Sequence, residues 1–332
     1  MHPLRAPSFT AASGRSLQIV PGWPVLPDGI VLDRVVGIGE DSRGFVYLAH
    51  RGDHPLLRLK PDGSLDREIG AAHMRRTTAY DLRGPVPVPI ATRCWLHGLH
   101  IDPQDNVWIT DVGRHLVMKF SPHGELLATL GSDGVAGADA THFNQPTQVC
   151  VTPAGDLFVT DGYGNSRVVH LDARGRFIAE WGSRGVQPGQ FHTPHMITRD
   201  AAGRLYVSDR ENDRIQVFTE SGAVLGVWEG LHSVDGLHAG ADGLLYASCG
   251  TDNAVLRLDL TGRVLDVWIP PDGFRYPHAV ATGRDGCIYV AETGDAWRVT
   301  GPKPEDRFAL ERQGPEGSGA KKLRLAPAAG RP

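Results

Sequence analysis

Apolar and polar residues alternate along most of the chain in short runs, which are separated by turns rich in Asp and Gly. Alternation with a period of two residues predicts β-strands with one buried face. The runs come in groups of four, joined by D-x-x-G turns or other Asp-containing turns, and each group takes about 40 residues. Six such groups predict an all-β fold, a six-bladed β-propeller, because closing the ring protects the sheet edges.

The repeats can be aligned on their first two strands. First strands, each with its following turn, are expected at Gly37–Gly44, Gly98–Asn106, Thr147–Gly155, His195–Gly203, Asp235–Gly243 and His278–Gly286. Second strands are expected at Phe45–Ala49, Val107–Thr110, Leu157–Thr160, Leu205–Ser208, Leu244–Ala247 and Cys287–Ala291. Residues 31–310 would form the propeller, and the segment 1–30 would supply a closing strand to the last blade from Leu17–Val25. Residues 311–332, rich in Gly, Ala, Pro, Lys and Arg, are expected to be a disordered tail.

Composition excludes several classes of function. The chain of 332 residues has a net charge of −4 and no long basic run, so no nucleic-acid partner is expected. No apolar run approaches the roughly 18 residues that a membrane span needs. The first residues lack the apolar core of a secretory signal, and the 4 cysteines form no C-x-x-C pair. A cytoplasmic monomer with buried free thiols is the expectation.

Three histidines recur at one point of the repeat, in Leu96-His97-Gly98, Pro194-His195-Met196 and Pro277-His278-Ala279. They fall in the second, fourth and sixth repeats, and alternate blades of a six-fold ring stand about 120° apart around the axis. The sequence therefore predicts that this histidine triad holds a metal on the axis with an open side, as in catalytic zinc sites. Zinc is the default ion, while iron, cobalt and manganese stay open. The alternative is a triad that closes the channel through hydrogen bonds alone.

Other polar residues are expected near the triad, in the turns after second strands. Arg51 and Arg210 occupy matching turns of two blades, and two guanidinium groups suit a substrate that carries a carboxylate. Tyr163 occupies the matching turn of a third blade, where a phenol beside a cation can serve as a base. The turns Asp161–Arg167 and Asp209–Arg214 resemble the NHL repeat. Their Asp and Asn residues are expected to hydrogen-bond the turn backbone rather than to take part in chemistry.

From about Val35 to Arg298 the chain resembles the peptidyl-α-hydroxyglycine α-amidating lyases, six-bladed propellers that cleave a carbinolamide to an amide and glyoxylate. The segments that carry the resemblance are Phe45–His54, His97–Phe120, His142–Trp181, Gly189–Phe218 and Pro277–Glu292. The resemblance implies that zinc is held by the same triad. It also implies that Tyr163 is the active-site tyrosine and that Arg51 and Arg210 are the active-site arginines.

The chain departs from the family at several points. Ala279 replaces an aspartate that helps to hold calcium, so calcium is expected to be weak or absent, although the two family carbonyls fall on Ile38 and Leu99. Asp235 is a candidate replacement for the lost carboxylate at such a second cation site. Tyr276 replaces an active-site methionine and is expected to bind and select the substrate. Gly164 replaces a family cysteine, so one family disulfide is missing.

These observations predict a zinc-dependent carbon–nitrogen lyase that acts on an N-acyl hemiaminal, a small molecule or peptide that carries a carboxylate. A separate monooxygenase would supply that substrate. Two alternatives remain: a metal-dependent hydrolase or lactonase on the same scaffold, and a diverged propeller that binds without catalysis. Lactonase propellers usually bind metal through carboxylates and Asn, whereas the axial set in this chain is rich in His.

Overall fold

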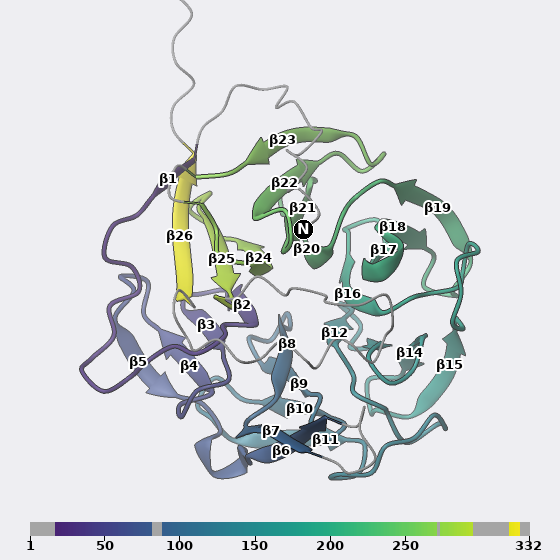
Figure 1. The fold of residues 1–332 in the computed structure, drawn as a ribbon, viewed down its shortest axis with the longest axis horizontal. Helices are drawn as coiled ribbons and strands as arrows, with labels where there is room; N and C mark the ends of the chain where they lie inside the picture. Colours follow the sequence, from purple (N-terminus) through teal and green to yellow (C-terminus); the bar gives the residue numbers. More distant parts are fainter. Residues whose placement is uncertain (1–16, 82–87, 271–272, 295–318, 326–332) are drawn as a thin grey trace, which may run out of the picture.

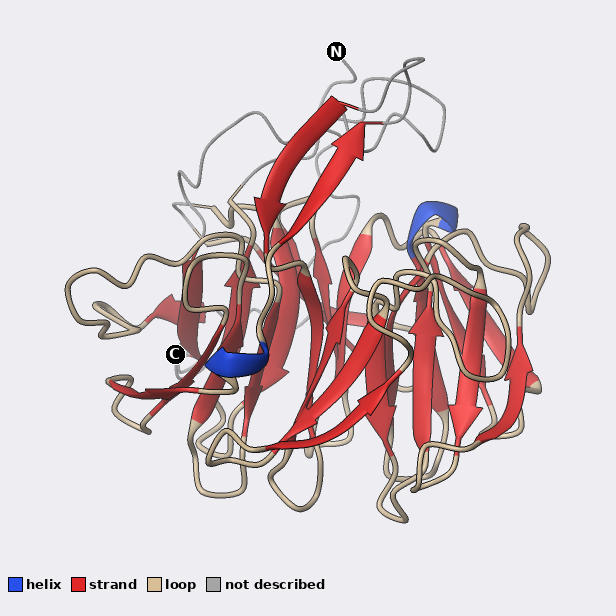
Figure 2. Ribbon diagram, turned by 90° about the horizontal axis from the view of Figure 1, so that it is seen from below, coloured by secondary structure: helices blue, strands red, loops and turns tan. Residues whose placement is uncertain are grey.

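The computed structural model describes residues 17–81, 88–270, 273–294 and 319–325. Six four-stranded antiparallel sheets are arranged around a central axis (Figure 1), so the predicted six-bladed β-propeller is confirmed. Seen from the side, the strands stand next to one another in a disc (Figure 2). The helical structure of the described residues consists of two 3₁₀ turns, η1 (Ala71–His73) and η2 (Arg210–Asn212). Neither has the length or the apolar character needed to cross a membrane.

Five blades are continuous in sequence. The first comprises β2 (Gly37–Glu40), β3 (Val46–Ala49), β4 (Leu56–Leu59) and β5 (Leu65–Glu68). The second comprises β8 (Leu96–Ile101), β9 (Val107–Asp111), β10 (Leu116–Phe120) and β11 (Leu126–Leu130). The third comprises β12 (Gln148–Val151), β13 (Leu157–Asp161), β14 (Arg167–Leu171) and β15 (Phe177–Trp181). The fourth comprises β16 (Pro194–Arg199), β17 (Leu205–Asp209), β18 (Arg214–Phe218) and β19 (Val224–Glu229). The fifth comprises β20 (Val234–Ala239), β21 (Leu245–Cys249), β22 (Ala254–Leu258) and β23 (Val264–Trp268).

The sixth blade joins the two ends of the chain. Its order from the axis outward is β24 (Pro277–Thr282), β25 (Ile288–Glu292), β26 (Gly319–Leu325) and β1 (Leu17–Ile19). The expectation that residues 311–332 are a disordered tail is therefore wrong for Gly319–Leu325, which pairs with β25 on one side and β1 on the other. The remainder of that segment, and residues 1–16, lie outside the described residues. Strands from both ends in one sheet close the ring and cover its last edge.

The Asp-containing turns fold as the sequence predicts. In the first blade, one carboxylate oxygen of Asp41 accepts the backbone N–H groups of Arg43 and Phe45 at 2.9 and 3.0 Å. Gly44 closes the turn at φ = +84°, a conformation that a side chain would strain. The same carboxylate pattern recurs at Asp102 and Asp200. In these three blades this local chemistry fixes where the first strand ends, and with it the register of the blade.

The core lies between the blades. Six clusters of buried apolar side chains each join two neighbouring sheets around the ring. Leu48 of β3, which is 0% exposed, packs in the cluster between the sixth and first blades. Truncating such a residue to Ala would cost about 2–5 kcal/mol of the free energy of unfolding. Because every blade is packed on both faces, the inner strands form a rigid wall around the axis.

One hairpin interrupts the repeat between the first and second blades. It is formed by β6 (Thr77–Asp81) and β7 (Val88–Arg93) and stands out from one face of the disc (Figure 2). The indole N–H of Trp95 donates to the carbonyl of Thr77 at 2.9 Å, which ties the base of the hairpin to the second blade. The hairpin therefore sits beside the start of β8, the strand that carries His97.

Candidate metal centre

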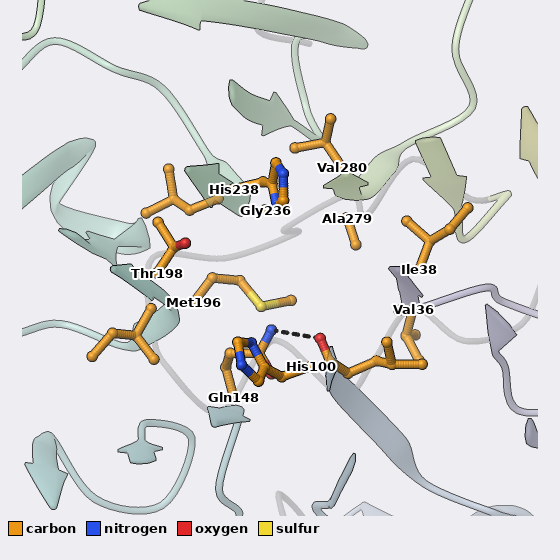
Figure 3. A pocket seen from close by; sticks show the side chains of 14 residues that line it. Val36, Ile38, His100, Gln148, Met196, Thr198, Gly236, His238, Ala279 and Val280 are labelled. Carbon is orange, nitrogen blue, oxygen red and sulfur yellow. Dashed lines mark hydrogen bonds between the residues drawn. The ribbon is translucent and has the colours of Figure 1, made fainter. Parts of the chain in front are cut away.

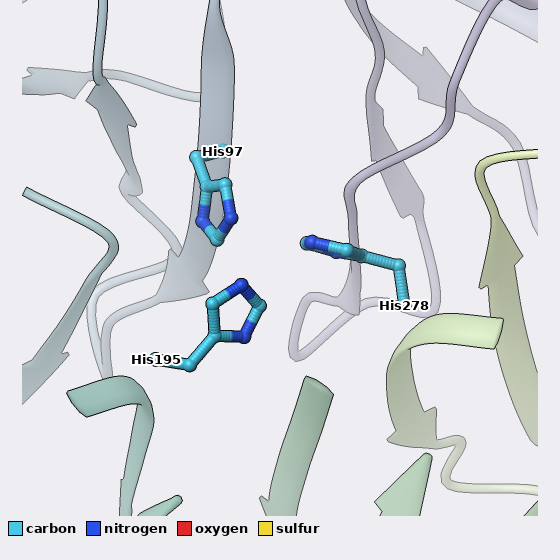
Figure 4. Close-up of side chains that lie close together, drawn as sticks. All are labelled: His97, His195 and His278. Atoms are coloured by element: carbon cyan, nitrogen blue, oxygen red, sulfur yellow. The ribbon is translucent and has the colours of Figure 1, made fainter. Parts of the chain in front are cut away.

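The three predicted histidines meet on the axis. His97, His195 and His278 lie at the starts of β8, β16 and β24 in alternate blades, and their rings point toward one another (Figure 4). One ring nitrogen from each lies within 4.8 Å of the others, and the ring centroids are 4.6–5.1 Å apart. The three side chains are 0–4% exposed. The sequence thus predicted the right three residues to converge.

The backbone of the intervening blades orients these rings. The Nδ1 atoms of His97, His195 and His278 lie 2.7–2.8 Å from the carbonyl oxygens of Thr147, Asp235 and Val36 respectively. A carbonyl only accepts, so each Nδ1 carries the proton and each Nε2 has a free lone pair. Each imidazole therefore bonds to the equivalent residue of the next blade. Three blades supply the histidines, and the three between them supply the carbonyls that orient the rings. Metal-binding histidines commonly have such a partner on the second nitrogen.

The triad is neutral. Burial lowers the pKa of His278 to about 3, with Arg51 adding to the effect. Burial also holds the pKa values of His97 and His195 well below the ordinary range, helped by His278 beside the first and Arg210 beside the second. Three neutral Nε2 atoms that face one another are the donor set of an open tetrahedral zinc site. In chemistry and orientation, the residues present fit a divalent transition metal.

Tyr163 completes the constellation. Its hydroxyl lies 2.9 Å from Nε2 of His97 and 3.0 Å from Nε2 of His195. The phenol has one proton, and both nitrogens are acceptors, so the hydroxyl can donate to only one of them at a time. A cation among these groups would satisfy all the lone pairs together. The hydroxyl is thus placed where a group bound at the triad would meet it.

Rigid turns place Tyr163 and Arg210. In the third blade, Asp161 accepts hydrogen bonds from Asn165 at 2.7 Å and from Nε of Arg167 at 3.0 Å. The fourth blade repeats this pattern, because Asp209 accepts from Asn212 and Arg214. These contacts agree with the expectation that the Asp and Asn residues stabilise the turns. Tyr163 and Arg210 lie within those two turns and project toward the axis.

Arg210 is held between two carboxylates. Its Nε and Nη2 donate to Glu211 at 3.1 and 2.9 Å, and its Nη1 donates to Asp235 at 3.0 Å. Nη1 also lies 3.5 Å from the hydroxyl of Tyr163, and the guanidinium carbon is 5.5 Å from the centre of that ring. Burial acts to lower the pKa of Arg210, but the neighbouring carboxylates raise it well above its ordinary value. The residue is therefore a fixed cation next to the phenol.

Arg51 approaches the triad from the first blade. Its Nε donates to the carbonyl of Leu96, the residue before His97, at 3.2 Å. Its guanidinium carbon lies 5.2 Å from the ring centre of Trp95, which Arg93 contacts from another direction. The structure therefore brings Arg51, Arg210 and Tyr163 together with the triad.

A cavity lies on the axis next to the triad, lined by inner-strand residues from several blades (Figure 3). Ile38, Leu99 and Ala279 line it, as do Met196 and the imidazoles of His100 and His238. The carbonyl of Leu99 accepts a hydrogen bond from Nε2 of Gln148 at 3.3 Å (Figure 3). Asp235 is not among the lining residues, since its carboxylate bonds to Arg210, Ser233 and Gly250. The structure therefore brings Ile38 and Leu99 together but directs Asp235 elsewhere.

Tyr276 directly precedes β24, and its ring lies beside Asp235, next to Gly250. Its φ of +54° is unusual for a bulky residue, and its backbone N–H donates to Asn253 at 2.8 Å. A Cβ added at Gly250 would lie 2.3 Å from Oδ2 of Asp235 and 2.5 Å from the Tyr276 ring, so this corner is tightly packed. Burial, and then the charge of Asp235, raise the pKa of Tyr276 well above its ordinary value. Tyr276 is thus a neutral phenol.

The chain matches the NHL repeat family at residues 143–171 and 191–218. It is 32% identical over 326 residues to peptidyl-glycine alpha-amidating monooxygenase B of Xenopus laevis, an alignment that covers 86% of this chain and 36% of that protein. It is 41% identical over 217 residues to peptidyl-alpha-hydroxyglycine alpha-amidating lyase 1 of Drosophila melanogaster, covering 60% and 40% of the two chains. The chain is therefore similar to the amidating lyases and contains NHL repeats.

The chain also matches other propellers. It is 29% identical over 300 residues to NHL repeat-containing protein 3 of Homo sapiens, an alignment that covers 82% of this chain and 80% of that protein. A streptogramin B lyase structure superposes with a TM-score of 0.58 at 16% identity, covering 96% and 100% of the two chains, and shows the shared fold alone. The chain spans only 32–36% of the length of the vertebrate amidating monooxygenases that it matches.

Sequence reasoning missed how Arg210 is held. Glu211 follows Arg210 directly in the chain, which could have pointed to an ion pair. The repeat aligns Asp235 with the histidines, but it does not predict the ion pair with Arg210, because that pair joins two different blades. The four cysteines, all within the described ranges, are free and buried, as predicted.

Proposed function

We propose that the protein is a zinc-dependent lyase that cleaves an N-acyl hemiaminal, R-CO-NH-CH(OH)-R′, to an amide and a carbonyl compound. One observation carries the proposal: three neutral, carbonyl-oriented imidazoles converge beside the hydroxyl of Tyr163 and the guanidinium of Arg210. The kinship with proteins named as amidating lyases supports the same chemistry. With a carboxylate as R′, the carbonyl product is glyoxylate.

The residues of this chain have separate roles in the proposal. His97, His195 and His278 would hold zinc, which when bound supplies a Lewis acid that lowers the pKa of a hydroxyl. Tyr163, as the phenolate, takes the proton of the substrate hydroxyl. As the C–O bond becomes a carbonyl, the C–N bond breaks, its electron pair passes to the amide nitrogen, and that nitrogen receives the proton that Tyr163 took. The rigid turn around Tyr163 keeps its oxygen at the place where this transfer occurs.

The two arginines would favour an anionic substrate and the charge that develops as the C–N bond breaks. Arg51 approaches from the first blade and Arg210 from the fourth, so they stand on different sides of the triad. Tyr276 adds a bulky neutral phenol to the wall and would select for the shape of the substrate. A separate monooxygenase could supply a hydroxylated substrate, and the protein would need no other partner.

Calcium has no place in this proposal. A calcium site would require hard oxygen ligands, and carboxylates above all. Ala279 contributes none, and the amide of Gln148 already donates to the carbonyl of Leu99. The lining by Met196 and two imidazoles is also unsuited to a hard cation.

The test is glyoxylate release from α-hydroxyhippurate by purified, zinc-loaded protein, with a chelator-treated sample as the control. Release that stops with the chelator and returns with added zinc would support the lyase. If zinc binds with defined stoichiometry and neither glyoxylate nor benzamide forms, the proposal is wrong for this substrate class. Other hemiaminals and lactones should then be screened, since a hydrolase would use the same metal with an activated water.

A further inference from the structure

Asp235 contacts a candidate metal ligand through its backbone and a candidate catalytic group through its side chain. Its backbone carbonyl accepts from Nδ1 of His195 at 2.7 Å, and its side chain accepts from Nη1 of Arg210 at 3.0 Å. The residue is 0% exposed. One inner-strand position therefore couples the orientation of the fourth-blade histidine to that of the fourth-blade arginine.

Both carboxylate oxygens of Asp235 are fixed. Oδ2 accepts from the hydroxyl of Ser233 at 3.0 Å and from the backbone N–H of Gly250 at 3.1 Å, which leaves Oδ1 directed at Arg210. Gly250 and Tyr276 pack closely around this carboxylate, since a Cβ added at Gly250 would meet both Oδ2 and the Tyr276 ring. A buried carboxylate with so little freedom is well suited to define where a guanidinium group lies.

Arg210 depends on this partner for its direction. Glu211 binds Nε and Nη2, on one side of the guanidinium, whereas Nη1 has Asp235 and the Tyr163 hydroxyl as its partners. Glu211 is the next residue in the chain and belongs to the same turn as Arg210. Asp235 belongs to the inner strand of another blade, so its bond joins the guanidinium to the wall of the channel.

We propose that Asp235 is a positioning residue that holds the guanidinium of Arg210 against the hydroxyl of Tyr163. The effect of Asp235 on turnover rests on the proposed lyase function, in which Tyr163 receives the substrate proton. Its effect on the position of Arg210 does not depend on that function. Asp235 acts through Arg210 and does not touch the substrate.

The first test is a crystal structure of zinc-free Asp235→Ala beside that of the parent protein. The guanidinium of Arg210 should leave the Tyr163 hydroxyl, while His195 keeps its bond to the backbone carbonyl at position 235. An Arg210 that stays in contact with Tyr163 would overturn the proposal. This comparison stands even if the parent protein releases no glyoxylate, in which case the lyase function fails and the structure alone decides on Asp235.

The second test is a double-mutant cycle on glyoxylate release. Asp235→Ala should lower kcat about 10²-fold, as misplacement of a catalytic group can do, with little change in zinc content. In an Arg210→Ala background the same substitution should cost nothing further, and an additive loss would refute action through Arg210. Asp235→Asn keeps one oxygen for Nη1 and should recover part of kcat.

A matched control lies in the same blade. Asp266 is also 0% exposed and pairs with Arg257 between outer strands, away from the axis. Asp266→Ala should lower the Tm but leave kcat unchanged. If Asp235→Ala does not fold, the comparison of Asp235→Asn with Asp266→Asn replaces it, and equal kcat values would contradict the proposal.

Discussion

Zinc should stabilise this protein through the triad, and loss of one ligand should remove most of that effect. At a free zinc concentration about 1,000 times the dissociation constant, binding to the native state adds about 4 kcal/mol to the free energy of unfolding. For a domain of this size, that corresponds to a rise in Tm of about 6 °C. In His195→Ala the Nε2 ligand is gone, so zinc should raise the Tm only slightly.

The substitution has a second, zinc-independent cost. Nδ1 of His195 donates to the buried carbonyl of Asp235, and an unsatisfied buried acceptor costs about 1–3 kcal/mol. The zinc-free Tm of His195→Ala should therefore be lower than that of the parent protein. The informative quantity is the difference between zinc-loaded and chelator-treated Tm values, taken for each variant separately.

The assay is thermal unfolding by calorimetry with matched metal analysis. His238→Ala is the control, because that imidazole bonds to Thr282 and lies outside the triad. It should keep the full zinc-dependent rise. If His195→Ala keeps that rise as well, zinc stabilises the protein at another place, and the assignment of the triad is wrong.

Three further outcomes are expected. Tyr163→Phe should lower kcat at least about 10²-fold with unchanged zinc content, measured by glyoxylate release, and undiminished turnover would exclude Tyr163 as the proton acceptor. Acid should destabilise the zinc-free protein as the pH falls from about 6.5 toward about 4, because burial lowers the pKa values of His50, His100 and His238 to about 4 and their protonation favours unfolding. A denaturant midpoint that is flat across this window would contradict that. Calcium should leave the Tm of the chelator-treated protein unchanged, and a calcium-dependent rise would show that the carbonyls near Ala279 hold a cation without its carboxylate.

The sequence predicts the blades well because their signals are local. The turn at Asp41 and its equivalents needs only a carboxylate and a few backbone N–H groups within one segment, so each repeat can be located from its own residues. The strand Gly319–Leu325 has no such signal. It follows a long segment without strand pattern, and only pairing with β25 and β1, which are distant in sequence, makes it a strand. Long-range closure of a ring is set by topology rather than by local propensity.

The same distinction applies to the candidate site. The histidines could be placed from the repeat, because equivalent positions in alternate blades must face the axis at one height. The ion pairs around Arg210 depend on which side chain of the next blade reaches across, and that depends on packing rather than on spacing. Trp95 beside Arg51 is a similar case, since the hairpin that anchors it interrupts the repeat.

The alternation of blades explains why one scaffold can build this centre. A histidine in every blade would bring six imidazoles to the axis, whereas an open zinc site uses three. With His97, His195 and His278 in alternate blades, each intervening blade offers a backbone carbonyl, which any residue type can supply. Side chains at the carbonyl positions are therefore free to differ, and they do: Val36, Thr147 and Asp235. The carboxylate of Asp235 accepts from Arg210, while its backbone carbonyl accepts from His195. One residue therefore orients both a candidate metal ligand and the guanidinium beside Tyr163.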